Sequence, residues 1–256
     1  MKNIIACRPE SYGPHHERCW SHLPSIGVRY LEASVPESDN EDRVLRQRLE
    51  THGLSVSSFK GQCDVTRDGV AEQMSPQLAR CADHGVGILF VSAKAGDTDR
   101  NYVWQRLREV GDVAAASGVT VVLETHPDLV TNADVGLQTM QAVDHPNIRI
   151  NFDTANIHYY NRDVDTTKQL EKVIGKVAAV HLKDTTGRYR TWDFPALGSG
   201  IVDFPSVFKL LGDRGFAGPC AIELEGTEGL ERDEAAQLEY VADSVRYLKR
   251  IGAMEE

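Results

Sequence analysis

The sequence has no long apolar run. Its first segment, MKNIIACRPESYGPHH, reaches Arg8 and Pro9 after only a few apolar residues. This is too short for the hydrophobic part of a secretory leader and far too short for a membrane span. We therefore expect a cytoplasmic protein that does not enter a membrane.

Positive charge is scarce as well, because 28 Lys and Arg residues stand against 38 Asp and Glu residues and leave a net charge of −10. Such an excess repels nucleic-acid phosphates and anionic lipids, so neither is expected as the main partner. The five cysteines are scattered and form no CxxC pair. This pattern is typical of reduced thiols in a reducing compartment.

The sequence also lacks linkers and low-complexity stretches, so residues 1–256 are expected to form a single domain. What recurs eight times is a short apolar, β-branched run followed by a longer segment with helical periodicity. The predicted strands span residues 3–7, 28–34, 54–59, 86–92, 119–125, 148–153, 177–183 and 220–225. The predicted helices span residues 15–23, 41–52, 71–84, 100–117, 133–142, 166–174, 205–214 and 233–251.

This alternation predicts an α/β fold, a (β/α)8 TIM barrel, whose usual size of about 250 residues matches the chain. An open doubly wound sheet is the alternative. It is less favoured because no strand opens into a GxGxxG or P-loop glycine pattern.

Polar residues end the last four predicted strands, in the segments ETHP, FDTAN, VHLKD and IELEG. In a TIM barrel the carboxyl ends of the strands surround one cavity, which holds the active site. Successive side chains of a strand point alternately into the barrel and toward the helices. One choice of inward residue on each of these four strands leaves an apolar residue just before it facing the helices. That inward set is Glu124, Asp153, His181 and Glu223.

Three carboxylates and an imidazole in one cavity repel one another unless a cation lies among them or one carboxyl takes a proton. A single carboxylate at a strand end is more often a helix cap or a surface ion pair, but four in register favour a functional site. An oxygen-rich ligand set predicts one divalent metal ion, with Mn²⁺ or Mg²⁺ favoured and Zn²⁺, Co²⁺ or Fe²⁺ permitted.

These segments, together with LGSGIVDFPSVFKLL at residues 197–211, resemble the xylose isomerase-like TIM-barrel family. They are most similar to its sugar phosphate isomerase/epimerase group, relatives of the ketose 3-epimerases and inosose dehydratases. The resemblance implies that the four inward residues bind one divalent metal ion. It also implies that Glu124 and Glu223 are catalytic, exchanging a substrate proton from opposite faces, and that the chain assembles into a homo-oligomer.

The implied function is a metal-dependent sugar isomerase or epimerase acting on a ketose or ketose phosphate. A proton is removed next to the carbonyl through a metal-bound enediolate. Loss of a β-hydroxyl from the same intermediate makes a keto-sugar or inosose dehydratase, and the metal site alone does not separate these outcomes.

Two further functions are less favoured. An apurinic-site endonuclease of the same broad fold needs a richer set of histidines than the first strand ends offer, and the net charge of −10 opposes DNA binding. A barrel that binds a sugar without turning it over is the other, and the retention of both Glu124 and Glu223 speaks against it.

Four further residues near the strand ends are candidates for substrate binding. His126 could bind substrate hydroxyls, and Asn156 stands where free-ketose 3-epimerases carry a histidine. His158 either contacts the substrate or packs behind the tyrosines that follow it. Lys183 points the same way as His181 and either contacts a substrate oxygen or pairs with a carboxylate.

The segment 185–203 is a long loop, and such loops in compact domains are often functional lids. It carries Arg188 and Arg190, and residues 183–190 contain three basic residues and one acidic residue. Loops after the seventh and eighth strands of barrels often bind phosphate, so the two arginines are predicted to bind a phosphorylated sugar. The alternative is that they pair with loop acids or with a neighbouring subunit.

Overall fold

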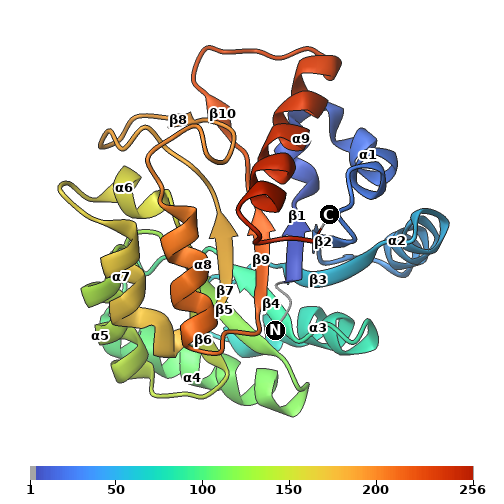
Figure 1. Ribbon diagram of the computed structural model, residues 1–256. Helices are drawn as coiled ribbons and strands as arrows, with labels where there is room; N and C mark the ends of the chain where they lie inside the picture. The colour runs from blue at the N-terminus through green and yellow to red at the C-terminus, as the bar shows by residue number, and fades with distance from the viewer. Residues whose placement is uncertain (1–3, 256) are drawn as a thin grey trace.

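The structure, a computed structural model, describes residues 4–255, which form the predicted barrel (Figure 1). Eight parallel strands close in the order β1-β2-β3-β4-β5-β6-β7-β9, with β9 paired to β1. The prediction of a (β/α)8 fold is confirmed, although Asn3, the first residue of the first predicted strand, lies outside the described residues. The barrel strands are β1 (Ile4–Cys7), β2 (Tyr30–Ser34), β3 (Ser55–Lys60), β4 (Ile88–Val91), β5 (Thr120–Glu124), β6 (Ile148–Asp153), β7 (Val177–Leu182) and β9 (Pro219–Ile222).

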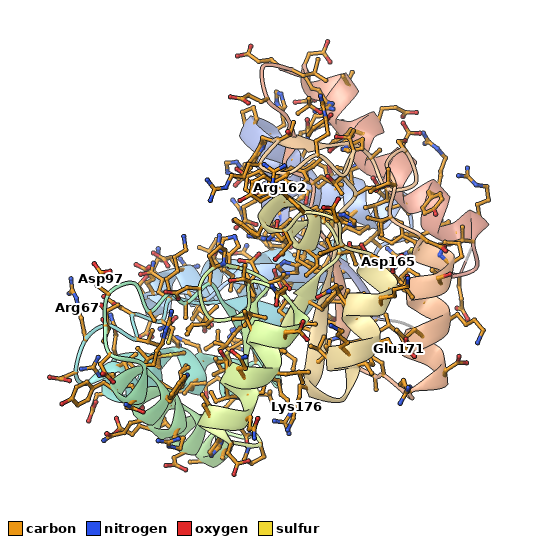
Figure 2. The ribbon with its side chains drawn as sticks, turned by 90° about the vertical axis from the view of Figure 1, so that its left-hand side faces the viewer. Arg67, Asp97, Arg162, Asp165, Glu171 and Lys176 are labelled. Atoms are coloured by element: carbon orange, nitrogen blue, oxygen red, sulfur yellow. The ribbon has the colours of Figure 1, made fainter. Side chains whose placement is uncertain are left out.

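Helices connect successive strands and cover the outside of the barrel (Figure 1). Several begin at a residue whose side chain accepts a backbone N–H of the first turn, as Ser38, Asn132 and Asp165 do. Figure 2 shows Glu171 on one helix and Lys176 just before β7, both on the outer surface. The main helices are α2 (Asp39–His52), α3 (Val70–Asp83), α4 (Arg100–Ala116), α5 (Ala133–Val143), α7 (Thr166–Val173), α8 (Phe204–Asp213) and α9 (Glu234–Arg250).

The first connection differs from its prediction. Instead of one helix over 15–23, a 3-10 helix η1 (Pro9–Arg18) leads into α1 (Cys19–Ser25). Gly13 has φ of 54° and Pro14 follows it, so an α-helix can begin only beyond this point. Two further short elements were not predicted, α6 (Asn156–Tyr160) and η2 (Ile174–Lys176).

The strands alternate as predicted. Phe90, Val122 and Ala179 form a small apolar cluster of their own, separate from the large core. Val122 and Ala179 each lie two residues before a predicted metal ligand, so they share its side of the strand. The neighbouring apolar residues belong to the large core under the helices, as the inward register requires: Leu123, Phe152, Val180 and Ile222.

The loop over 185–203 has structure of its own, contrary to the expectation of a structureless lid. Its strand β8 (Asp193–Phe194) pairs antiparallel with β10 (Gly226–Thr227), which follows β9. The buried Asp184 accepts backbone N–H groups of three residues of the loop, at 2.8 to 3.1 Å, from Gly198, Gly200 and Val202. These bonds fix the returning half of the loop against the end of β7.

The described residues can be compared with the expectations of no membrane span and of unpaired cysteines. Within residues 4–255, no helix is both long enough and apolar enough to cross a membrane. All five cysteines lie in this range and none forms a disulfide, as predicted.

Candidate active site and metal centre

The four predicted metal ligands come together at the carboxyl ends of neighbouring strands. Glu124 ends β5, Asp153 ends β6, His181 is the penultimate residue of β7 and Glu223 directly follows β9. Asp153 and His181 are direct partners in the sheet register. All four are buried, and one ligand atom of each lies within 4.8 Å of the others. The predicted cluster is therefore present.

Several atoms of the cluster have no hydrogen-bond partner among residues 4–255. They are Asp153 Oδ2, His181 Nδ1 and Glu223 Oε2. His181 Nδ1 lies 3.1 Å from Glu223 Oε2 and 3.6 Å from Glu124 Oε1. Buried polar atoms nearly always have partners, so unsatisfied donor atoms that gather at one point fit a divalent cation. Three carboxylates and one imidazole are a ligand set that can bind a divalent metal ion.

Backbone and side-chain contacts orient these ligands. Asp153 Oδ1 accepts the N–H groups of Ala155 and Asn156, each at 2.8 Å, which leaves Oδ2 for the cavity. His181 packs against the ring of Phe90, with ring centroids 4.6 Å apart. The cluster is therefore held in place by the protein itself.

Two charged residues behind the cluster were missed or underrated by sequence reasoning. Glu32 on β2 is 1% exposed, and its Oε1 lies 2.9 Å from His181 Nε2. Its Oε2 accepts a hydrogen bond from Ser58 Oγ at 2.9 Å. Arg8, just after β1, forms an ion pair with Glu223 Oε1. The signal that could have revealed Glu32 is its place between the apolar Leu31 and Ala33, which turns it inward.

Electrostatics tie the carboxylates to the imidazole. Burial acts to lower the pKa of His181, but the charge of Glu32, the nearby Glu124 carboxylate and the hydrogen bond to Glu32 outweigh it and raise this pKa to about 9. Burial acts to raise the pKa of Glu124, and His181 overcomes it and lowers that pKa to about 2. Burial raises the pKa of Asp153. Without a metal ion, the imidazolium of His181 therefore balances the surrounding carboxylates.

This balance predicts a pH dependence for the metal-free protein. The pKa of His181 is about 9 in the folded state and about 6.5 in the unfolded chain, so its stabilisation is complete below pH 6.5 and lost as pH rises through 9. We expect EDTA-treated protein to lose about 3 kcal/mol of unfolding free energy over this range in urea titrations. Metal binding displaces the same proton, so metal affinity is expected to rise with pH.

The His181→Gln variant is the control for this pH profile, because it removes the titrating group and keeps a polar side chain. Its unfolding free energy is expected to change less between pH 6.5 and pH 9 than that of the EDTA-treated wild type. Identical profiles for the two proteins would remove His181 as the cause.

A cavity of about 850 Å³ opens onto the cluster, and three of the predicted substrate-binding residues line it: His126, Asn156 and Lys183. Lys183 is 2% exposed, and its Nζ donates to Asn156 Oδ1 at 3.1 Å. The same ammonium pairs with Glu225 and lies 3.6 Å from Glu223 Oε2. Both readings of Lys183 from the sequence thus fit its position, since it pairs with carboxylates and faces the cavity.

His126 is held at both ring nitrogens. Nδ1 lies 2.8 Å from Ser92 Oγ, and Nε2 lies 2.8 Å from the hydroxyl of Tyr160. The ring is therefore fixed at the cavity wall, and a substrate hydroxyl can bind to it only by replacing one of these partners.

The other three predicted substrate-binding residues do not line this cavity. His158 is buried, with Nε2 2.8 Å from Thr166 Oγ1. Arg188 is exposed and pairs with Asp193 at 3.1 Å, which matches the alternative of a loop ion pair. Arg190 has φ of 51° and packs its guanidinium against the ring of Tyr189. Their predicted contacts with substrate thus find no support in this geometry.

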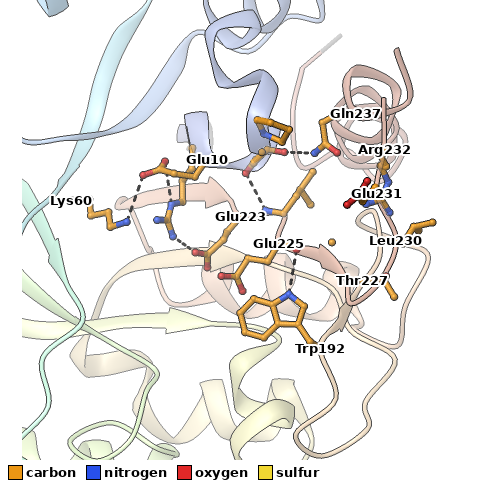
Figure 3. Close-up of a pocket in the computed structure, with 16 residues that line it drawn as sticks. Glu10, Lys60, Trp192, Glu223, Glu225, Thr227, Leu230, Glu231, Arg232 and Gln237 are labelled. Atoms are coloured by element: carbon orange, nitrogen blue, oxygen red, sulfur yellow. Dashed lines mark hydrogen bonds and ion pairs between the residues drawn. The ribbon is translucent and has the colours of Figure 1, made fainter. Parts of the chain in front are cut away.

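A second cavity of about 750 Å³ adjoins the first beside Glu223 (Figure 3). Figure 3 shows Lys60 and Glu10 at one end and the segment with Leu230, Glu231 and Arg232 at the other. Trp192 lines this cavity, and its Nε1 donates to the Glu225 carbonyl at 3.3 Å. The cluster is thus reached from two connected spaces.

A closed (β/α)8 barrel with a buried carboxylate and histidine cluster at its carboxyl end defines a class of TIM-barrel enzymes with a candidate metal centre. Within that class, the family model described as xylose isomerase-like TIM barrel matches residues 21–251 of the sequence. The chain belongs to this family, and the predicted family resemblance is confirmed.

The chain is also similar to individual proteins of known sequence or structure. Over 240 residues the chain is 28% identical to the L-ribulose-5-phosphate 3-epimerase UlaE of Salmonella paratyphi C, covering 80% of this chain and 82% of that protein. It is 27% identical over 278 residues to an inosose dehydratase of Yersinia enterocolitica, covering 91% and 89%. The crystal structure of a xylose isomerase domain protein from Planctomyces limnophilus matches with a TM-score of 0.79 at 21% identity, covering 98% of each chain. The curated relatives are thus sugar epimerases and dehydratases.

Proposed function

We propose that this protein is a divalent-metal-dependent sugar isomerase or epimerase that acts on a ketose or ketose phosphate by removing a proton next to the carbonyl. The observation that carries the proposal is the pair Glu124 and Glu223 in one buried cluster. In that cluster Asp153 Oδ2, His181 Nδ1 and Glu223 Oε2 have no hydrogen-bond partner among residues 4–255. Glu124, Asp153, His181 and Glu223 would hold the ion.

The bound ion supplies polarisation of the substrate carbonyl and of a neighbouring hydroxyl, which acidifies the adjacent C–H. Glu124 and Glu223 come from strands separated by β6 and β7, so they approach the substrate from different sides. One group, as the carboxylate, takes the proton, and the other, as the carboxylic acid, delivers its own proton to the opposite face, which inverts the carbon. Proton exchange with water then restores the two protonation states. Return to the neighbouring carbon instead converts a ketose to an aldose. In this proposal the Lys183 ammonium binds a substrate hydroxyl, and the His126 ring does so by exchanging Ser92 or Tyr160 for the substrate.

Dehydration is the second candidate, favoured by the position of Lys183. Loss of a β-hydroxyl needs a proton donor at the leaving oxygen. Lys183 is a buried ammonium in the cavity wall, held near Glu223 and paired with Glu225. It could supply that proton and recover it through the adjacent carboxylates.

Proton exchange in D₂O tests the proposal. Metal-loaded protein is incubated with a panel of ketoses, ketose phosphates and inososes, and deuterium incorporation at each carbon is followed by NMR. We expect exchange next to the carbonyl of one panel member, loss of that exchange with EDTA and its return with Mn²⁺ or Mg²⁺. Exchange that persists at full rate in EDTA would contradict metal dependence. No exchange with any member, together with cleavage of abasic DNA, would overturn the proposal.

A further inference from the structure

The wall of the main cavity farthest from β9 carries an excess of positive charge. Lys60 at the end of β3 and Arg67 and Lys94 in the loops after β3 and β4 line this wall. They stand against one carboxylate, Asp64. Figure 2 shows these loops on one side of the molecule, marked by Arg67 and by Asp97. In a chain of net charge −10, this local surplus of two positive charges faces the substrate space.

The adjoining cavity has the opposite balance. The two cavities share Arg8, Lys60, Glu223 and Glu225, but the charged residues that belong only to the second are Glu10, Glu231 and Arg232. An anionic ligand group that reaches out from the metal cluster is therefore drawn toward the loops after β3 and β4, and away from the segment after β10.

Of these three cations, Lys94 is the one whose ammonium group has no partner in the described part of the chain. Among residues 4–255, no hydrogen bond or ion pair engages its ammonium group, and its side chain is exposed. Phe90, Ser92 and Lys94 alternate along the chain and all line the cavity. The backbone beside Lys94 is fixed, since the N–H of Ala95 donates to Asp128 Oδ1 at 2.8 Å. A free ammonium on an anchored backbone thus faces the substrate space.

Lys60 and Arg67 have only weak competing partners. Lys60 Nζ lies 3.5 Å from Glu10 Oε1, with nearly half of its side chain exposed. Arg67 Nε lies 3.0 Å from Asp64 Oδ2 at an exposed site. Asp64 also accepts hydrogen bonds from the N–H and the hydroxyl of Thr66, so its charge is already engaged. Exposed ion pairs of this kind contribute little to stability, so an incoming anion can replace the carboxylates in them.

We propose that Lys60, Arg67 and Lys94 bind the phosphate group of a phosphorylated ketose whose carbonyl end lies at the metal cluster. Three cations against one carboxylate suit a dianion better than a neutral hydroxyl end. This inference rests on the proposed function for the sugar end of the ligand. It places the phosphate on the loops after β3 and β4, in contrast to the predicted site at Arg188 and Arg190, which lie outside the cavity lining.

Inorganic phosphate is the first probe, because it tests the site without turnover. Calorimetric titration of EDTA-treated protein is expected to show binding, weakened at least about 10-fold in the Lys60→Gln/Lys94→Gln double variant. Lys176→Gln is the matched control, because Lys176 precedes β7 at the other end of the barrel. It is expected to bind phosphate as the wild type does. Acetate is titrated in parallel, and it is expected to bind more weakly than phosphate.

The second measurement uses the metal-loaded enzyme and the ketose phosphate that exchanges in D₂O. In the double variant, KM for the phosphorylated ketose is expected to rise at least about 10-fold, while KM for the same ketose without phosphate stays unchanged. Equal phosphate affinity in the wild type and the double variant would overturn the inference. So would acetate binding as tight as phosphate, which would indicate a carboxylate site. Phosphate binding that depends on these lysines in a protein that exchanges no sugar would leave the anion site standing and overturn the proposed reaction.

Discussion

Replacing Glu223 with Gln is expected to slow deuterium exchange into the substrate by at least about 1,000-fold. The change keeps the size of the side chain but removes the carboxylate that we propose takes or returns the proton. It also weakens one of the four ligands of the candidate metal site, because Glu223 Oε2 has no hydrogen-bond partner among residues 4–255. Both effects act on the same step.

Deuterium exchange measured at saturating Mn²⁺ separates the loss of the carboxylate from the weaker metal binding. Metal analysis of the protein confirms that the site is filled. With the metal restored, the loss of the proton-transfer group is expected to remain, and exchange persists at most for one of the two epimers. Glu124→Gln is expected to give the complementary result, with the other epimer affected. Glu171→Gln, the same change on the outer surface of α7, is the control and is expected to exchange at the wild-type rate. Unchanged exchange in Glu223→Gln would remove this residue from the reaction.

Glu32→Gln is expected to weaken Mn²⁺ binding by about 10- to 100-fold. The Glu32 carboxylate lies 2.9 Å from His181 Nε2, so it fixes the tautomer that leaves Nδ1 free for the metal. Its negative charge also makes the imidazole a better donor. Gln keeps an acceptor of similar shape, and Ser58 can still hold it, so the variant loses mainly the charge.

Direct titration of EDTA-treated protein with Mn²⁺ measures this effect, with Glu171→Gln again as the surface control. A positioning role also predicts an altered Mn²⁺ electron paramagnetic resonance spectrum, which a general loss of stability would not produce in protein that remains folded. An affinity within twofold of the wild type would show that His181 does not depend on Glu32 for metal binding.

The sequence was sufficient to predict the barrel and the four clustered residues, because both follow from periodicity. Alternation along β5, β6 and β7 fixes which side chains point inward, and parallel pairing brings the ends of neighbouring strands together. Glu124, Asp153, His181 and Glu223 are therefore recoverable from local pattern alone.

The contacts behind the cluster could not be predicted in this way. Arg8 and Glu223 are 215 residues apart, and Glu32 and His181 are 149 apart, so their pairing follows from closure of the barrel. The local pattern shows a charged residue after β1 and another in β2, without showing what each one faces. Arg188 and Arg190 illustrate the same limit, because a basic run does not reveal on which side of a loop its side chains lie.

The pairing of β8 with β10 joins the loop after Lys183 to the segment after Glu223. Thr227 Oγ1 donates to Asp193 Oδ1 at 2.9 Å, and the N–H of Glu228 donates to the Trp192 carbonyl at 2.9 Å. The two segments therefore form one mechanical unit, although they follow different strands. A displacement that widens the entrance on this side must therefore carry both segments together or break the hydrogen bonds between them.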